Sequence, residues 1–381
     1  MQGLNLKLLI LGKYYAPVRG GIETHTRDLA LAVGPHHEVR VLVHNEGPDT
    51  VMERVDGVEL VRVGTVARPL KQPISPDVFR HIRDFAPDII HVHAPNIWAT
   101  LAALVAGGKA RIVVTHHADI VGREPVRSAA LVLYRALVRR SAALIVSASN
   151  NHAFSRDLKD VTTAARAIPF CLEPSPFADE PGFADAARAL RTATFGDRPV
   201  AAFIGRLVPY KGADRLIAAL AAAPGVGAVI IGGGPSEAAL KRQAQALGVD
   251  DRIHFAGSCD DRTKAMWLAA CDMFVLPSVT TAEAFGIVQI EAMLWARPVI
   301  TTNLPSGVPQ VGQDGETCLI VPPGDVPALA EAIGRLATDP TLRFRMGQAG
   351  LSRARDLYSV ERFNQTMLAL YDDVAAGPAR P

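Results

Sequence analysis

Residues 273–300 read MFVLPSVTTAEAFGIVQIEAMLWARPVI and hold the clearest structural pattern in the chain. Four apolar residues, Met273–Leu276, are typical of a buried strand. A polar loop follows, and apolar residues at helical spacing then predict a helix over Ile287–Ala296. β-branched residues resume at Val299, so a second strand is expected there. A strand, a helix and a strand in this order form a parallel pair joined by a crossover.

The same alternation runs along the rest of the chain. Apolar and β-branched runs predict strands at Lys7–Leu11, Val39–Val43, Val58–Val63, Ile89–His93, Arg111–Thr115, Leu144–Ser147, Val200–Gly205, Ala228–Gly232, Arg252–Ala256, Val299–Thr301 and Leu319–Val321. Helical spacing predicts helices at Ile22–Val33, Trp98–Ala106, Val126–Arg139, Ala213–Ala222, Glu237–Leu247, Val326–Ala337 and Val360–Asp373. Strands that alternate with helices build parallel sheets covered on both faces. The predicted class is therefore α/β, with two doubly wound, Rossmann-like units.

A chain of 381 residues is longer than one hydrophobic core usually supports, so two domains are expected. The alternation loosens over Pro169–Pro199, where several prolines predict an inter-domain linker. We expect an N-terminal domain over residues 1–170 and a C-terminal domain over residues 171–359, with a last helix at 360–375 joining the first domain. Ligands of such sheets bind at the carboxyl ends of the strands, so a cleft between the domains is the expected site.

The composition describes an ordinary globular protein, with 49% hydrophobic and 20% charged residues. No secretory signal is predicted, and no run of about 20 apolar residues predicts a membrane-spanning helix. The four cysteines form no Cys-x-x-Cys pair, so reduced and mostly buried thiols are expected. Together these features predict a cytoplasmic protein.

Charge is spread unevenly, although the net charge is only +2. Residues 1–170 hold 21 Lys/Arg and 15 Asp/Glu, whereas the remainder holds 19 and 23. A basic N-terminal half could face an anionic acceptor or an anionic membrane, and scattered solvated charge explains the same counts. The arginines of Val126–Arg140 leave two alternatives, a helix lying on the inner face of the plasma membrane or the solvated face of a packed helix.

Paired glycines at Gly20-Gly21 lie between the first predicted strand and the first predicted helix. Glycines let the backbone approach a ligand closely, and a helix N-terminus favours an anion. The pair is not a dinucleotide fingerprint, because Gly12-Lys13-Tyr14 lacks the glycines required after the strand. An NAD-dependent dehydrogenase is therefore not expected.

Two cations follow another predicted strand, in the segments Gly205-Arg206 and Lys211-Gly212. A guanidinium and an ammonium in one cleft suit a diphosphate, whereas a solvated pair is the alternative. Lys211 is expected at a helix N-terminus, which is unfavourable for a cation unless an anion binds there. A third glycine cluster, Gly232-Gly233-Gly234, follows the next strand and is expected at the same edge of the sheet.

Two glutamates belong to the 273–300 stretch. Glu283 lies in its loop, and Glu291 is expected in the second turn of a helix that begins near Gly286. The free N–H groups of the first turn of that helix would face phosphate oxygens or sugar hydroxyls. Carboxylates suit vicinal hydroxyls because each oxygen accepts a hydrogen bond.

These segments resemble the signature of the retaining glycosyltransferases of family 4. The resemblance runs essentially end to end, and its motifs occur in the family's order at the expected strand ends. It implies a GT-B fold, in which two Rossmann-like domains face each other across a cleft. The N-terminal domain would bind the acceptor, and the C-terminal domain would bind the nucleotide-sugar donor. The family commonly has glycine where Ala296 stands.

The resemblance also implies roles for single residues. Arg206 and Lys211 would hold the diphosphate, Glu291 would bind the ribose hydroxyls, and Glu283 would position the transferred sugar. The implied catalytic set is Glu283, His117, Arg206 and Lys211. The implied donor-binding set is Gly20, Gly21, Arg206, Lys211, Gly233, Glu283, Phe285, Gly286, Ile287, Val288 and Glu291.

His117 resembles the family's histidine near the sugar, and His116 is an adjacent alternative. His91-x-His93 together with His116-His117 could also indicate a metal site. No metal is expected, because these histidines lack a carboxylate at ligand spacing and the chain has no Asp-x-Asp motif, which usually couples a divalent ion to a diphosphate. No cofactor is expected either, since the nucleotide diphosphate sugar is a co-substrate. The expected partner is a glycan or a polyprenyl-diphosphate-linked acceptor, and no nucleic acid.

Residues 302–309, TNLPSGVP, resemble bacterial polysaccharide mannosyl- or rhamnosyltransferases, which favours a GDP-linked donor and mannose or a similar hexose. The expected mechanism is front-face attack with retention, in which the departing diphosphate accepts the acceptor's proton. Two different functions are compatible with the same residues. A sugar-nucleotide epimerase shares this fold without needing an acceptor, and a non-catalytic nucleotide-binding module would need only the two cations.

Overall fold

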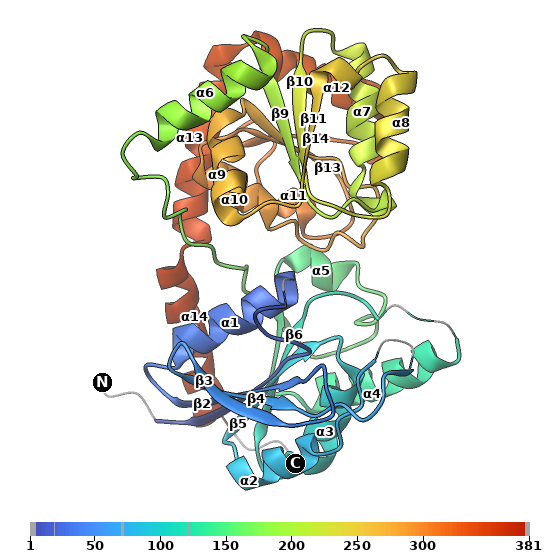
Figure 1. The fold of residues 1–381 in the computed structure, drawn as a ribbon. Coiled ribbons are helices and arrows are strands. Elements are labelled where there is room, and N and C mark those ends of the chain that lie inside the picture. The colour runs from blue at the N-terminus through green and yellow to red at the C-terminus, as the bar shows by residue number, and fades with distance from the viewer. Residues whose placement is uncertain (1–4, 19, 70–71, 121, 123, 378–381) are drawn as a thin grey trace. The chain divides into compact units, whose positions relative to one another are not determined.

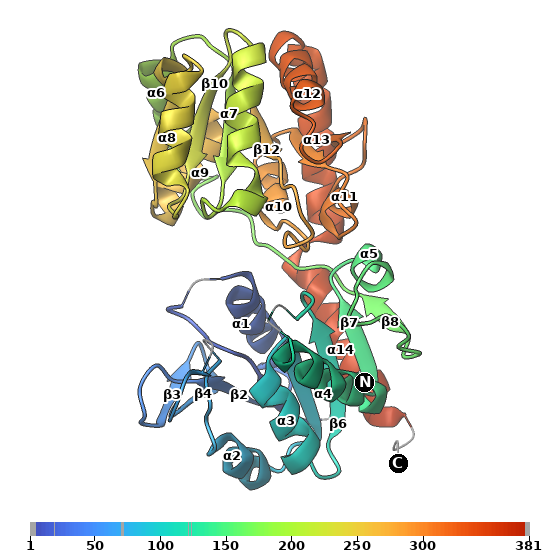
Figure 2. The same ribbon diagram turned by 90° about the vertical axis from the view of Figure 1, so that its right-hand side faces the viewer.

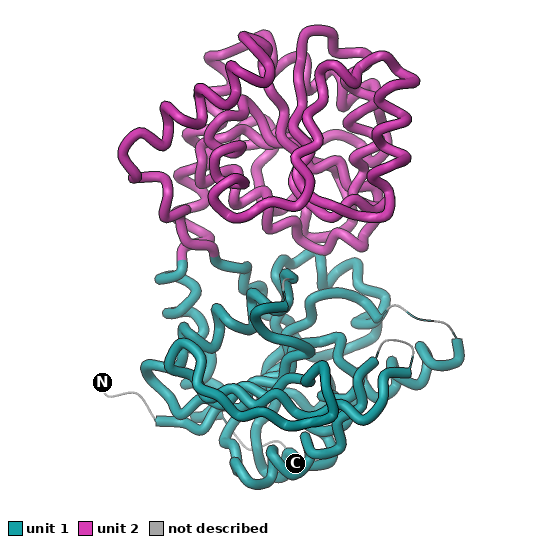
Figure 3. The backbone as a smooth tube through the Cα atoms, in the orientation of Figure 1, with its two compact units in different colours: residues 1–171, 360–381 teal, residues 172–359 magenta. Residues whose placement is uncertain are grey.

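The chain forms two compact units in a computed structural model that describes residues 5–18, 20–69, 72–120, 122 and 124–377. The first unit comprises Met1–Cys171 together with Val360–Pro381, and the second comprises Leu172–Ser359 (Figure 3). The chain therefore leaves the first unit once and returns to it with its last helix.

The first unit is built on an eight-stranded sheet in the order β3-β4-β2-β1-β5-β6-β7-β8. The strands are β1 (Lys7–Leu11), β2 (Glu38–His44), β3 (Val51–Val55), β4 (Val58–Val63), β5 (Ile89–Ala94), β6 (Arg111–His116), β7 (Ala143–Val146) and β8 (Ala165–Ala167). All neighbouring strands pair in parallel except β3 and β4, which form a hairpin. The turn of that hairpin is Asp56-Gly57, with φ of 52° and 83°, as tight hairpin turns require.

Helices cover both faces of this sheet, and each face has its own core (Figure 1, Figure 2). One face packs against α1 (Gly21–Val33) and the C-terminal helix α14 (Val360–Ala376), which contact each other. The other face packs against α2 (Val78–Phe85), α3 (Ile97–Ala106) and α4 (Val126–Arg140). A short helix, α5 (Ser149–Ala153), follows β7.

The second unit is built on a six-stranded, wholly parallel sheet in the order β11-β10-β9-β12-β13-β14. Its strands are β9 (Val200–Ile204), β10 (Gly227–Ile231), β11 (Ile253–Gly257), β12 (Met273–Leu276), β13 (Val299–Thr302) and β14 (Cys318–Val321). The strand order reverses between β9 and β12, so the loops that leave these two strands diverge at the switch point where such sheets bind ligands.

The helices of the second unit lie on both sides of its sheet (Figure 1). They are α6 (Phe183–Phe195), α7 (Ala213–Ala222), α8 (Glu237–Ala246), α9 (Asp261–Ala270), α10 (Val288–Leu294), α11 (Val308–Val311), α12 (Val326–Thr338) and α13 (Pro340–Leu357). Helix α6 packs against α9 and α7 against α12. None of the described helices is both long and apolar enough to cross a membrane.

The predicted α/β class with two doubly wound sheets is confirmed. The linker predicted over Pro169–Pro199 is wrong for much of its length, because α6 occupies Phe183–Phe195 within it. The prolines lie outside this helix, and Phe183, Ala187 and Phe195 bury its inner face. Helices α9 and α13 were not predicted, and α10 is shorter than the helix expected over Ile287–Ala296.

Candidate active site

The loop that follows β9 depends on glycines at both of its ends. Gly205 has φ of 157° and Gly212 has φ of 73°, a region that side chains rarely adopt. A Cβ on Gly212 would lie 2.0 Å from the carbonyl oxygen of Pro277, which follows β12. The loops after β9 and β12 are therefore in backbone contact, and no other residue fits at this position.

This close approach brings Lys211 and Glu283 together. The Lys211 Nζ lies 2.5 Å from Glu283 Oε2, and only 13% and 10% of the two side chains are exposed. Ser278 Oγ donates a second hydrogen bond to the same oxygen, at 3.1 Å. Lys211 ends a 3-10 turn, Pro209–Lys211, and lies directly before Gly212, the N-cap residue of α7. The Glu283 carboxylate, and not an anion at a helix end, compensates the charge of Lys211.

Arg206 lies in the same loop but differs from Lys211 in its environment. It is exposed, and its guanidinium makes no hydrogen bond or ion pair with the residues that the structure describes. A guanidinium has five donors in a planar fork, which suits two oxygens of a phosphate. Arg206 is therefore free to bind an anion, whereas Lys211 already has a partner.

Glu291 lies in the first turn of α10, not in the second turn as expected, because the helix starts at Val288. Its Oε2 lies 2.9 Å from the Nζ of Lys264, on α9. Burial opposes the charge of Lys264, but the Glu291 carboxylate, with smaller contributions from Asp261 and Cys259, more than offsets this, so the pKa of Lys264 is raised. The ammonium thus holds the carboxylate at the start of α10.

The segment Phe285–Val288 presents backbone donors. Gly286 has φ of 78°, and a Cβ there would lie 2.6 Å from a methyl group of Leu276. Gln289 supports the loop, because its Nε2 donates to the carbonyl oxygens of Phe285 and Val308 at 3.3 and 3.2 Å. Within the described chain, the N–H groups of Gly286, Ile287 and Val288 have no hydrogen-bond acceptor. Three consecutive free donors are available to a ligand's oxygens.

The glycine cluster after β10 packs against the loop after β9. A Cβ on Gly232 would lie 2.0 Å from the Gly205 carbonyl oxygen, and one on Gly234 would lie 2.4 Å from that of Leu207. A Cβ on Gly233 would meet the Ser258 hydroxyl at 3.0 Å. The three predicted loops of the second unit therefore gather at one edge of its sheet.

The remaining predicted residues belong to the first unit. Gly20 is extended and caps the N-terminus of α1, where Gly21 is the first residue. A Cβ on Gly20 would lie 2.2 Å from the Glu23 carboxylate, so the glycine makes room for this acidic group. The neighbouring Arg19 lies outside the described residues.

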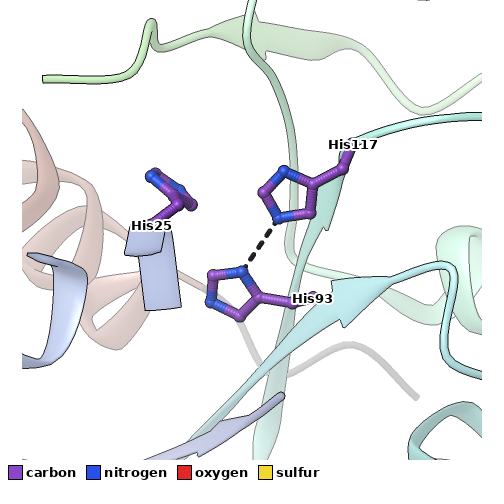
Figure 4. A group of neighbouring side chains, drawn as sticks. All are labelled: His25, His93 and His117. Atoms are coloured by element: carbon purple, nitrogen blue, oxygen red, sulfur yellow. Dashed lines mark hydrogen bonds between the residues drawn. The ribbon is translucent and has the colours of Figure 1, made fainter. Parts of the chain in front are cut away.

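His116 and His117 point to opposite faces of the sheet, as successive residues of a strand must. The Nδ1 of His116 lies 2.7 Å from the Tyr134 hydroxyl on α4, and its Nε2 lies 3.6 Å from Asp119. His117 instead joins His93 and His25 on the side of α1 (Figure 4). His116 thus lies on the face of the sheet that packs against α4, whereas His117 lies on the face that packs against α1.

His25, His93 and His117 form a buried cluster that we call the histidine cluster. Their exposed fractions are 5%, 1% and 5%. The Nδ1 of His93 lies 2.9 Å from the Nε2 of His117, and the ring of His25 contacts both of these rings edge-on. Burial lowers the pKa of His25 to about 3 and lowers those of His93 and His117 well below the ordinary value, so all three rings are neutral.

Three neutral imidazoles are also potential metal ligands. One ring nitrogen of each lies within 4.8 Å of the others, and they form the one such group found among the described residues. The rings around them are aromatic: Phe170 stacks on His117, and Phe363 of α14 contacts His25 edge-on. No carboxylate of the described chain joins the group.

Comparison with known proteins identifies the family. Residues 20–169 match the glycosyl transferase 4-like domain, and residues 190–353 match the glycosyl transferases group 1. The O-antigen chain mannosyltransferase C of Escherichia coli is 32% identical over 298 residues, which cover 77% of each chain. The chain belongs to glycosyltransferase family 4. It is an enzyme of that family, as its motifs predict.

Two further comparisons extend this result. A Mycolicibacterium smegmatis protein described as a GDP-mannose-dependent alpha-(1-6)-phosphatidylinositol monomannoside mannosyltransferase is 29% identical over 92% of this glycosyltransferase and 94% of its own length. Anabaena HepE, solved in complex with UDP, superposes with a TM-score of 0.77 at 21% identity, covering 97% of this chain and 100% of HepE. The second likeness shows the fold alone, which is GT-B.

Sequence reasoning missed two residues of this glycosyltransferase. Lys264 was not singled out, because an isolated lysine in a polar helix carries no local signal of its partner. His25 was not singled out either, since it lies 68 residues from His93 in the sequence. The one available hint was that His25 falls on the buried stripe of α1 together with Leu29 and Ala32.

Proposed function

We propose that this glycosyltransferase moves a hexose, mannose or a similar sugar, from a nucleotide diphosphate sugar to a glycan or lipid-linked acceptor with retention of configuration. A GDP-linked donor is favoured. The observation that carries the proposal is the ion pair of Lys211 with Glu283 where the loops after β9 and β12 touch, with the exposed Arg206 in the first of these loops. A free cation, a paired cation and a carboxylate at that edge supply what a sugar diphosphate needs.

The diphosphate is the part of the donor that these cations bind best. Arg206 is exposed and unpaired among the described residues, and Lys211 lies one loop turn away with its charge largely buried. As the bond to the sugar breaks, negative charge grows on the diphosphate, and preorganised cations stabilise it. In this proposal the two side chains replace a divalent metal ion, so the reaction is metal-independent.

The sugar and the ribose are assigned to the two glutamates. Glu283 and the free N–H groups of Gly286, Ile287 and Val288 suit sugar hydroxyls and phosphate oxygens, because they offer both acceptors and donors. Glu291, held by Lys264, suits the vicinal ribose hydroxyls. Attack is proposed on the face that the diphosphate leaves, with a phosphate oxygen taking the acceptor's proton.

The donor base and the acceptor are inferred from relatives. The M. smegmatis relative is described as GDP-mannose-dependent and as acting on a phosphatidylinositol mannoside. The E. coli relative is described as an O-antigen chain mannosyltransferase. Both point to polysaccharide or glycolipid biosynthesis, with a polyprenyl-diphosphate-linked glycan among the candidate acceptors. HepE was solved with UDP, so the choice of base needs a direct test.

Peripheral contact with an anionic membrane at the cytoplasmic face is part of the proposal, carried by the outer face of α4. Val126 and Val132 are 47% and 69% exposed, and Arg139 and Arg140 are exposed at the end of the same helix. Arg127 turns inward instead, where it binds the buried Asp157 at 2.7 Å. Flotation with liposomes should increase with anionic lipid and fall in Val132→Asp, and binding indifferent to both changes would remove this part of the proposal.

Thermal shift against GDP-, UDP- and ADP-sugars, with and without EDTA, tests the donor site. We expect stabilisation by the GDP series, unchanged by EDTA and lost in Arg206→Ala. Arg215→Ala is the matched control, because Arg215 is a half-exposed arginine of the neighbouring helix α7 that pairs with Asp214. Stabilisation that requires a divalent ion, or that survives Arg206→Ala, would contradict the proposed diphosphate site.

A further inference from the structure

The contact between His93 and His117 contains a single proton. The two nitrogens are 2.9 Å apart, and the ring planes differ by only 14°. Both imidazoles are neutral, because burial lowers their pKa values well below 6.5. A neutral imidazole has one N–H and one bare nitrogen, so one ring must donate and the other must accept.

The proton between the two rings can belong to either ring, and the two arrangements differ in the protonation of the ring nitrogens outside this hydrogen bond. These are Nε2 of His93 and Nδ1 of His117, and both are buried without a partner among the described residues. If His93 Nδ1 donates, His93 Nε2 is bare and His117 Nδ1 carries a proton. If His117 Nε2 donates, the protons are reversed, and His93 keeps a buried N–H with no acceptor.

The depth of the two rings separates these arrangements. His93 is 1% exposed and His117 is 5% exposed, and His93 stacks on His91, whose own nitrogens are both hydrogen-bonded, to Tyr371 and Thr115. An orphaned N–H in a protein interior is rarer and costlier than an orphaned acceptor. Each arrangement leaves one buried N–H without an acceptor, and the favoured arrangement places that N–H on His117, the less deeply buried of the two rings.

We propose that His93 is a positioning residue, which donates from Nδ1 to His117 Nε2 and so fixes His117 as the Nδ1–H tautomer. This inference rests on the proposed function and on the family resemblance, which places His117 near the transferred sugar. His117 would then offer the donor a neutral N–H, which suits a sugar hydroxyl or a phosphoryl oxygen. It would not offer a base, in keeping with a phosphate oxygen as the acceptor of the proton.

The surrounding rings keep His117 in this orientation. Phe170 stacks on it with planes 12° apart, and His25 contacts it edge-on with planes 78° apart. A rotation of the His117 ring by 180° about its Cβ–Cγ bond would put a ring carbon in place of Nε2 at the contact with His93. The hydrogen bond between the two rings would then be lost. The cluster thus fixes both the orientation of His117 and the nitrogen that bears its proton.

A metal ion is the competing interpretation of the same cluster. Tetrahedral zinc binds imidazole nitrogens at about 2.0–2.1 Å, which places two such ligands about 3.3 Å apart. The observed 2.9 Å between His93 and His117 is shorter and fits a shared proton. Metal binding is therefore the outcome that would overturn the proposal.

Nitrogen NMR of the full chain, labelled only at histidine nitrogens, tests the proposal, because protonated and bare imidazole nitrogens have well-separated shifts. The His117 signals are assigned by their loss in His117→Asn. We compare His93→Leu, which removes the donor, with His93→Asn, whose amide nitrogen is attached to Cγ like Nδ1. His81→Asn is the control, since His81 is a buried histidine of α2 on the opposite face of the sheet.

We expect His117 to be the Nδ1–H tautomer in the wild type, in His93→Asn and in the control, and to become a mixture in His93→Leu. The kcat/KM for the donor should fall about tenfold in His93→Leu, which corresponds to the loss of one hydrogen bond, and it should recover in His93→Asn. A wild-type His117 protonated at Nε2 would overturn the proposal. So would stoichiometric cobalt absorption that His93→Leu abolishes. The tautomer of His117 is measured by NMR in the protein without donor. The result therefore does not depend on whether the proposed donor is correct.

Discussion

The two units have the same doubly wound architecture, but the polar side chains singled out in them are charged in one unit and neutral in the other. In the second unit, the candidate site consists of charged pairs, Lys211 with Glu283 and Lys264 with Glu291, at the edge of the sheet. The first unit instead buries a cluster of neutral imidazoles in its core. Ten of the eleven histidines of the chain lie in the first unit, and His254 alone lies in the second. A charged ligand can replace one partner of an ion pair, whereas neutral, hydrogen-bonded rings keep a fixed geometry without a net charge.

The physical reason for the difference is desolvation. A partly buried charge needs a counter-charge, and removing one partner leaves the other uncompensated. A buried imidazole avoids this cost by losing its proton. The first unit should therefore respond to pH, and the second should respond to the loss of single charges.

Lowering the pH should produce the largest difference between the two units, in their free energies of unfolding. The pKa values of His25 and His91 are lowered to about 3, and that of His44 to about 4, so the unfolded chain binds more protons below pH 6.5. Stability is complete above this value and is lost as the pH falls, by about 1.4 kcal/mol per pH unit for each such histidine. Urea unfolding at pH 7.5, 6.5 and 5.5, followed by hydrogen exchange in peptides of each unit, measures the loss.

We expect the first unit to lose several kcal/mol over this range, while the second stays nearly unchanged. The range avoids the titration of ordinary carboxylates, so the histidines dominate. Equal losses in the two units would contradict the comparison.

Removing Lys211 should have the next largest effect. In Lys211→Met the growing charge on the diphosphate loses a cation, and kcat/KM should fall by about 10²–10³-fold, as for other preorganised electrostatic groups. Lys241→Met is the matched control, because Lys241 pairs with Glu237 at 2.7 Å on an exposed helix of the same unit. Steady-state kinetics with the donor identified by thermal shift gives both values. A similar small effect in both variants would mean that the Lys211 pair is structural.

The charged candidate site of the second unit could be predicted from the sequence because its residues follow strands directly. Parallel strands end at one edge, so Arg206, Gly233 and Glu283 had to gather there once the alternation was recognised. The sequence did not reveal which charges pair. Glu283 compensates Lys211, and Lys264 joins Glu291 from another helix, because loop packing and not spacing sets these contacts.

The histidine cluster could not be predicted from the sequence. Its members come from α1, β5 and the end of β6, and their contact depends on strand order and helix docking. The expectation of no metal rested on missing carboxylates, and it considered His93 and His117 but not His25. Helix α6, inside the predicted linker, was missed for a related reason, since its apolar face is buried only by the packing of α9 against it.

Lys264→Met should sharpen the comparison by testing an ion pair outside the diphosphate site. Without the ammonium, Glu291 is free to leave the start of α10, and we expect the Kd for the nucleoside diphosphate to rise about three- to tenfold, the equivalent of one hydrogen bond. Arg262→Met on the same helix is the control, because Arg262 forms an exposed pair with Glu180 at 2.6 Å. Titration calorimetry measures both. Unchanged affinity in Lys264→Met would show that Glu291 needs no partner to bind the ribose.

The smallest effect is expected at Ala296, where the family commonly has glycine. Its φ is 53°, a left-handed conformation that costs a residue with a Cβ about 1–2 kcal/mol, although glycine loses more chain entropy on folding. Ala296→Gly should therefore stabilise the second unit by about 0.5 kcal/mol in urea unfolding. Ala186→Gly, in the exposed interior of α6, should instead destabilise it by about 1 kcal/mol. If both substitutions destabilised the protein equally, the surroundings of Ala296 would compensate the strain of its left-handed conformation. The second unit would then tolerate a strained backbone conformation, just as it tolerates partly buried charges.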